Sequence, residues 1–274
     1  MRYLLLLLFI PLLTSCDDFF QQELDDPELD FDRKLVLFAL LTPNDTLQYV
    51  DVRASIPAFG PRPDGPSFRR QLQDATVVLD DGTNQFELAY ENGDGFEGYR
   101  IPHERVDITP GRTYVITATH EGTTAVGTTT VPTDSLRFSD LTVDIETEQQ
   151  GSFRERKLFL TAPNLPANEE EYYLIYHDRI SNNGRTQREL VDYVRGRDDL
   201  GDRLRFAPVF LIDGVRNAVS ICVTDRPTFT YLTTRDVAFA TQDNPFAEPA
   251  EVATNVEGGL GLVGGANCRR FVVN

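Results

Sequence analysis

The 274-residue chain has few basic residues, few histidines and no tryptophan. Its 26 lysine and arginine residues are outnumbered by 43 acids, which gives a formal net charge of −17 and an isoelectric point near 4.5. Nucleic-acid binding depends mostly on basic side chains that neutralise phosphates, so this balance argues against a nucleic-acid partner. The three histidines, His103, His120 and His177, show no metal-ligand spacing, and neither H-x-x-x-H nor C-x-x-C occurs. We therefore predict no metal site and no cofactor.

The motifs of common enzyme classes are also missing. No G-x-S-x-G sequence marks a hydrolase nucleophile. Residues 259–264 match G-x-G-x-x-G, but a dinucleotide site also needs an acid about 20 residues later, and the few residues after Gly264 contain none. Asp198, Asp199 and Asp202 lack the acid and glycine order of a calcium loop, and their arginine neighbours favour a surface loop. We predict no catalytic residues and no enzymatic activity.

The N-terminus carries the clearest signal in the chain. A short basic start precedes an apolar run over residues 4–13, which is too short to cross a bilayer because a span needs about 20 apolar residues. Leu13-Thr14-Ser15-Cys16 follows and resembles the bacterial lipobox, in which the cysteine thiol receives the lipid. We predict a lipoprotein signal peptide over residues 1–15 and lipid attachment at Cys16. An ordinary secretory signal that contains a cysteine is the alternative.

Residues 16–33 are strongly acidic, with no basic residue before Arg33. The acids are Asp17, Asp18, Glu23, Asp25, Asp26, Glu28, Asp30 and Asp32. Such a run is typical of a solvated, flexible tether. Acids directly after the cysteine also resemble the surface-export signal of certain Gram-negative lipoproteins. We therefore expect an outer-membrane lipoprotein exposed at the cell surface, with a periplasm-facing lipoprotein as the alternative.

Residues 34–131 show the pattern of a β-sandwich. Short apolar or alternating runs are separated by asparagine, aspartate and glycine turns, as tight hairpins require. The predicted strands are 34–41, 46–55, 75–80, 84–90, 97–101, 112–120 and 123–131. Seven strands in this length favour an immunoglobulin-like or transthyretin-like sandwich, although the Cys…Trp…Cys pin of antibody domains is absent. A proline-rich insertion over residues 56–68 is either a binding loop or a stiff surface excursion.

Residues 131–135 are predicted to join this sandwich to a second β-rich domain over residues 136–274. Its predicted strands are 136–145, 157–161, 172–180, 188–194, 207–212, 218–224 and 269–273. A single helix is predicted near residues 227–242, because Asp225-Arg226-Pro227 is a helix-start signal and apolar residues then recur at helical spacing. The whole chain is thus expected to be mainly β.

Cys222 and Cys268 remain once Cys16 is assigned to lipid. Two leftover cysteines in an exported chain usually pair, so we predict a disulfide between them. Two buried free thiols are the alternative.

The C-terminal part resembles the family called domain of unknown function 4249. The resemblance rests on the segments 243–249 and 254–265, with support from Ser55-Ile56-Pro57 and from residues 74–79, 110–114 and 131–136. The signature residues are Asn244, Pro245, Phe246, Glu248, Pro249, Asn255, Glu257, Gly258, Gly259, Gly261 and Gly264. They form either a partner-contacting loop or a rigid C-terminal clamp. The two cysteines depart from the family pattern.

The resemblance implies an outer-membrane lipoprotein of unknown biochemical activity. Members are often encoded beside a TonB-dependent transporter, which implies an accessory role in nutrient uptake. No catalytic residue carries over from the family. We expect an accessory binding component of a TonB-dependent uptake system. The alternatives are a cell-surface adhesin or structural module and, from a third class, a surface hydrolase.

Overall fold

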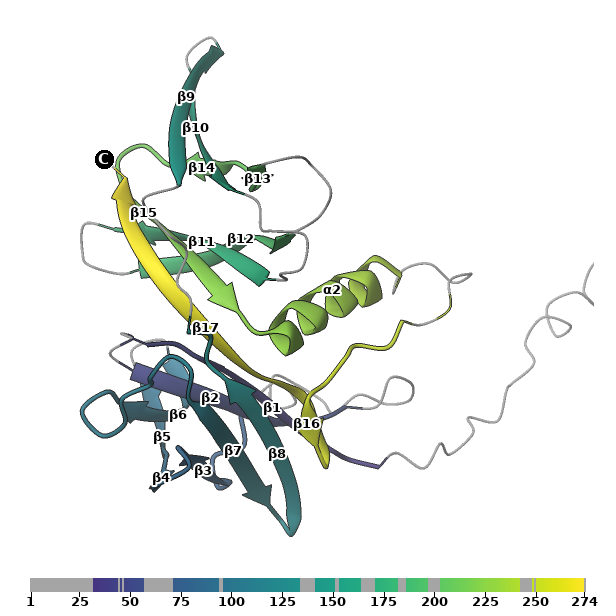
Figure 1. Ribbon diagram of the computed structural model, residues 1–274. Coiled ribbons are helices and arrows are strands. Elements are labelled where there is room, and N and C mark those ends of the chain that lie inside the picture. The colour runs from purple at the N-terminus through teal and green to yellow at the C-terminus, as the bar shows by residue number, and fades with distance from the viewer. Residues whose placement is uncertain are drawn as a thin grey trace, which may run out of the picture.

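The computed structural model describes residues 32–43, 45, 47–56, 71–93, 96–133, 141–150, 153–163, 171–181, 186–196, 203–241, 248 and 250–273 (Figure 1). Across these residues the chain is mainly β with a single helix, so the predicted fold class is confirmed. The predicted signal peptide, Cys16, the acidic segment before Asp32 and most of the proline-rich insertion lie outside the described residues.

The N-terminal part forms a two-layer sandwich. Its strands are β1 (Leu35–Leu41), β2 (Leu47–Ala54), β3 (Thr76–Asp80), β4 (Gln85–Glu87), β5 (Ala89–Gly93), β6 (Phe96–Pro102), β7 (Thr113–His120) and β8 (Thr123–Thr130). Alternate residues of β1, from Leu35 to Leu41, are at most 4% exposed and pack in one core with Tyr114 and Ile116 of β7. The period-two burial reflects strand geometry, since the sequence of β1 is apolar at every position and only alternate side chains face this core.

One predicted strand of this sandwich is two strands. The run over residues 84–90 breaks at the buried Leu88, where the chain passes from one layer to the other. β4 pairs with β3 in one sheet, whereas β5 pairs with β6 in the opposite sheet. The prediction of a single strand was wrong because the apolar pattern continues across this corner.

The second part of the chain adds two further layers. β9 (Thr142–Gln150), β10 (Phe153–Pro163), β13 (Arg203–Arg205) and β14 (Val209–Leu211) form a four-stranded sheet, here called the hairpin sheet. β11 (Glu171–Ile180), β12 (Thr186–Gly196) and β15 (Arg216–Thr224) form the opposite layer. A second core lies between the layers and includes Leu158, Leu160, Ile175 and Ile221.

The C-terminal strands join the two parts. β16 (Val256–Glu257) pairs with β8, and the long β17 (Gly259–Val273) lies parallel to β1 in its first half and antiparallel to β15 in its second. The result is an eight-stranded sheet, here called the large sheet, with the order β12-β11-β15-β17-β1-β2-β6-β5. In Figure 1, β17 runs in yellow from the sandwich to the upper layers. Strands on both sides of the predicted junction at 131–135 therefore share one sheet.

The last strand is also longer than predicted. It begins at Gly259 rather than at residue 269, so the glycine-rich segment is itself a strand. Glycine lowers strand propensity, which hides this strand in the sequence, but a glycine-containing strand permits a close approach of neighbouring backbone.

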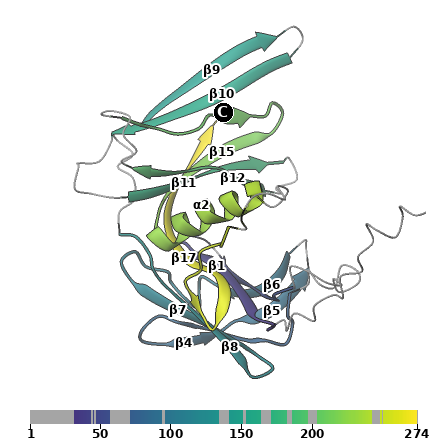
Figure 2. The same cartoon turned by 90° about the vertical axis from the view of Figure 1, so that its right-hand side faces the viewer.

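The helix α2 (Arg226–Thr241) confirms the prediction of a helix near residues 227–242. Asp225 caps it, because its Oδ1 accepts the backbone N–H of Thr228 at 3.0 Å. The other carboxylate oxygen of Asp225 accepts the Thr129 hydroxyl at 2.5 Å and the Gly265 N–H at 3.2 Å. Asp225 therefore ties the helix start to β8 and β17, and Figure 2 shows α2 lying along the upper layer above the sandwich.

The disulfide lies beneath this helix. Cys222 and Cys268 are register partners on β15 and β17, and their sulfurs are bonded. Cys222 is fully buried and packs with Leu174 of β11 and Leu232 of α2. The predicted disulfide is confirmed.

Candidate functional site

The signature glycines lie where β17 approaches its neighbours most closely. A Cβ atom at Gly261 would lie 2.1 Å from the carbonyl oxygen of Leu37 on β1, and Gly261 has a φ of 112°, a value that L-residues rarely adopt. At Gly264 a Cβ would lie 2.1 Å from the Thr228 hydroxyl of α2. Each glycine makes room for another part of the same chain.

Asn255 fastens β17 to the sandwich. Its side-chain amide donates to the carbonyl oxygens of Val263, at 2.7 Å, and of Thr128, at 3.1 Å. Its Oδ1 accepts the Val263 N–H at 3.0 Å. These contacts, like those of the glycines, agree with the clamp interpretation of the signature.

The remaining signature residues that the structure describes divide into two groups. Glu248 and Glu257 are exposed, and Gly258 and Gly259 continue the close contacts, since a Cβ would lie 2.5 Å from the Thr124 oxygen or 2.7 Å from the Leu35 oxygen respectively. Asn244, Pro245, Phe246 and Pro249 lie outside the described residues.

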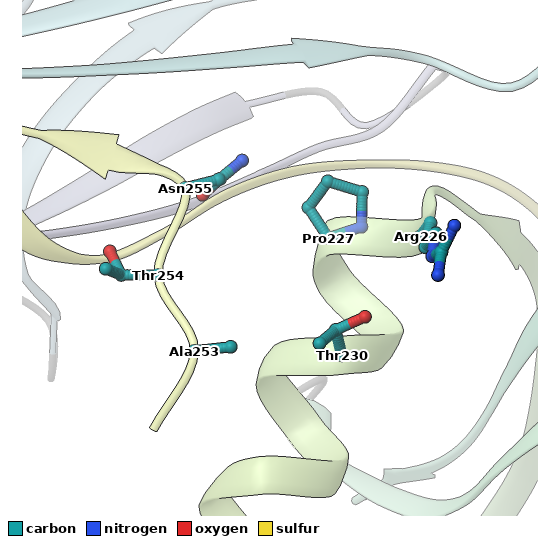
Figure 3. Close-up of a pocket in the computed structure, with 6 residues that line it drawn as sticks. All are labelled: Arg226, Pro227, Thr230, Ala253, Thr254 and Asn255. Carbon is teal, nitrogen blue, oxygen red and sulfur yellow. The ribbon is translucent and has the colours of Figure 1, made fainter. Parts of the chain in front are cut away.

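A hollow of about 240 Å³ adjoins this clamp (Figure 3). It is lined by Arg226, Pro227, Thr230, Ala253, Thr254 and Asn255. Figure 3 shows Ala253 pointing across the hollow toward the helix. Short side chains form most of the lining, and the amide of Asn255 is already engaged by Val263 and Thr128. The hollow is therefore a weaker candidate for ligand binding than the surface described next.

Tyrosine and arginine side chains gather on the face of the large sheet that carries α2. We define the tyrosine–arginine surface as Tyr49 of β2, Tyr176 of β11, Arg188 of β12, Arg235 of α2 and Arg270 of β17. The Arg188 guanidinium lies 5.5 Å from the centre of the Tyr176 ring, a cation–π distance. Tyr49 is 50% exposed, and the side chains of Arg188 and Arg270 are each 43% exposed. Rigid aromatic faces and guanidinium groups are thus available to solvent here.

A buried carboxylate positions two of these arginines. Asp178 has no exposed side-chain surface, and its oxygens accept the Nε–H of Arg188 at 2.8 Å and that of Arg270 at 3.0 Å. The Ser220 hydroxyl also donates to Asp178, at 3.4 Å. A buried charge requires such partners, and here one carboxylate neutralises only one of the two guanidinium groups. Asp236 pairs with Arg235 at 2.8 Å, and Asp45 lies near enough to act on Tyr49 and Arg188, so the arrangement offers guanidinium donors beside aromatic rings rather than a net positive charge. Such donors suit a polar partner.

The electrostatics of Tyr176 can be tested by titration. Burial raises the pKa of its hydroxyl to about 12, with the positive charge of Arg188 acting in the opposite direction. The ordinary value is 10.0, so between about pH 10 and 12 the folded chain binds this proton more tightly than the unfolded chain does. The resulting stabilisation is complete below about pH 10 and disappears as the pH rises through the folded pKa.

We therefore expect tyrosinate absorbance of the folded protein to include groups that ionise near pH 12, among them Tyr176 and Tyr193, whose pKa burial also raises to about 12. Tyr176→Phe should remove one tyrosine from this late phase. Ionisation of every tyrosine of the folded protein in one phase near pH 10 would contradict the prediction.

The sequence analysis singled out none of the residues of this surface. They come from four strands and a helix that are distant in the sequence, so no local spacing links them. One signal was present: Asp178 is a charge within the otherwise buried β11. His177, considered for metal binding, is buried and its Nε2 lies 2.9 Å from Oδ1 of Asn217. Among the described residues, no group of three or more histidines, cysteines or acids is placed to hold a metal ion.

Within the described part of the chain, no helix is both long and apolar enough to span a membrane.

Comparison with known proteins identifies the family of the chain. No curated protein matches the sequence. The model of one protein family, described as a domain of unknown function, matches residues 18–270. The chain therefore belongs to the DUF4249 family.

Proposed function

We propose that the protein is a lipid-anchored binding component of the outer membrane, exposed at the cell surface, which assists a TonB-dependent nutrient-uptake system. The lipobox ending at Cys16 and the acidic segment behind it support the location. The disulfide supports it as well, since such bonds persist in oxidising compartments outside the cytoplasm. The transport role follows from the family resemblance.

The observation that carries a binding role is the tyrosine–arginine surface. Tyrosine and arginine are enriched among the residues that dominate binding energy at protein interfaces. Here Arg188 and Arg270 are partly exposed and held by the buried Asp178, so these two side chains lose little freedom when a partner binds. The net charge of the chain is −17, and this local concentration of guanidinium groups therefore gives a partner a specific place to dock.

The binding role is tested by purifying the full-length lipoprotein from its native membrane in mild detergent. We expect a β-barrel TonB-dependent transporter to co-purify, and the amount to fall about tenfold or more for a Tyr49→Ala, Arg188→Ala variant. Arg105→Ala, at an exposed position outside this surface, should leave the amount unchanged. Absence of any transporter would overturn the proposal, and binding to surface glycans without a transporter would favour an adhesin.

The location is tested separately by Cys16→Ser. Without the thiol no lipid can be attached, so we expect the variant to move from the membrane fraction to the soluble fraction, because membrane anchoring requires the acyl chains. Protease added to intact cells should digest the wild-type protein. Retention of the variant in the membrane would contradict lipid anchoring, and protection from protease would indicate the periplasmic face.

A further inference from the structure

The hairpin sheet ends in an open edge. β9 pairs with β10 along its whole length in an unbroken register, and with no other strand among the described residues. Residues 142–149 of β9 are all exposed. Figures 1 and 2 both show the β9–β10 hairpin at the end of the molecule farthest from the sandwich. An edge strand of this length leaves a row of backbone N–H and C=O groups without strand partners.

The side chains of β9 differ between its two faces. Val143 and Ile145 are register partners of the buried Leu160 and Leu158, yet they are themselves 47% and 44% exposed. The other face carries acids in alternation: Asp144, Glu146 and Glu148. β9 thus presents an apolar row and an acidic row along one open edge.

The usual protections of an edge strand are mostly missing from β9. It contains no proline, lysine or glycine, and its pairing with β10 has no bulge. The acids of β9 disfavour pairing with the β9 strand of a second copy of the protein, because acids would then lie beside acids across the new strand pair. The same acids favour a strand with basic residues at the facing positions.

We propose that β9 is a docking strand for an extended segment of another protein in which basic and apolar residues alternate. The segment would add a further strand to the hairpin sheet and satisfy the open backbone groups of β9. Its apolar side chains would cover Val143 and Ile145, and its basic side chains would lie beside Asp144 and Glu146. This inference does not depend on the tyrosine–arginine surface or on the transport role.

The test uses the full mature chain and a synthetic peptide of alternating lysine and valine, equal in length to β9. We expect the peptide to bind and to slow amide hydrogen exchange in β9. A double variant, Asp144→Lys with Glu146→Lys, should bind it roughly tenfold more weakly, because two attractive cross-strand pairs become repulsive. The same variant should gain binding of a peptide in which glutamate replaces lysine.

The matched control is Glu104→Lys with Glu251→Lys, which changes the net charge equally at two exposed positions outside β9. It should bind the lysine peptide as the wild type does. If the control variant bound the lysine peptide as weakly as the β9 variant does, the effect would be one of overall charge, and the proposal would be overturned. Binding without slower exchange in β9, or self-association of the wild type through this edge, would overturn it as well.

Discussion

Replacing Gly261 by alanine is expected to lower the free energy of unfolding by about 4 kcal/mol. Two costs combine at this position. The φ of 112° is strained for any L-residue, and the new Cβ would lie 2.1 Å from the Leu37 carbonyl oxygen. β1 is a central strand of the large sheet, so it has no free direction in which to move. Urea unfolding followed by circular dichroism measures the effect.

A series of glycine variants controls for general loss of glycine flexibility. In Gly259→Ala the new Cβ would lie 2.7 Å from the Leu35 oxygen, but the residue has no positive φ. We expect this variant to lose about 2 kcal/mol of unfolding free energy. Gly93→Ala meets nothing within 4 Å and should change stability by less than about 0.5 kcal/mol. The loss of stability should be largest for Gly261→Ala and smallest for Gly93→Ala. A different order of the three losses would show that the close approach of β17 to β1 is not what requires glycine.

Removing the disulfide is expected to lower the free energy of unfolding about as much as the Gly261 substitution does. Cys222 and Cys268 are 46 residues apart, and a loop of this length stabilises the folded chain by about 4 kcal/mol on the chain-entropy description. The loop contains α2, β16 and the first half of β17. In a Cys222→Ala, Cys268→Ala variant we therefore expect the helix and the C-terminal clamp to unfold at markedly lower urea concentration.

The control for this variant is the wild-type chain in reductant, which should show the same loss of stability. Thiol counting provides an independent check. In a Cys16→Ser background the denatured chain should have no free thiol before reduction and two afterwards. A double alanine variant as stable as the oxidised wild type would falsify the stabilising role of the bridge.

Local patterns in the sequence predicted the individual elements well. A short apolar run in β1 and a partly alternating run in β7 indicated strands, and the structure has both. Asp225-Arg226-Pro227 indicated the start of α2, and the Asp225 carboxylate does cap it. The disulfide was also predictable, because two cysteines remain once Cys16 is set aside as the predicted lipid site, and two cysteines offer one pairing.

The sequence was less informative about where a strand passes from one sheet to another and about which strands it pairs with. At Leu88 the apolar pattern continues although the chain crosses between sheets, because Phe86 before the corner and Tyr90 after it both pack, partly buried, against the same core. In β17 the glycine-rich segment was interpreted as a loop or a rigid clamp, and the strand was predicted only from residue 269. The glycines are strand residues selected by the proximity of β1, β8 and α2, and that proximity is not encoded in any local spacing.

For this protein, the sequence by itself determined the mainly β class, the helix and the cysteine pair, since each depends on residues close in the chain or on residue counts. Only the tertiary structure decided that β17 joins both parts in one sheet and that Tyr49, Tyr176 and Arg188 share a face. It alone also shows that, among the described strands, β9 pairs only with β10. The physical reason is that strand pairing depends on long-range hydrogen bonds and packing, whose partners are set by the whole fold.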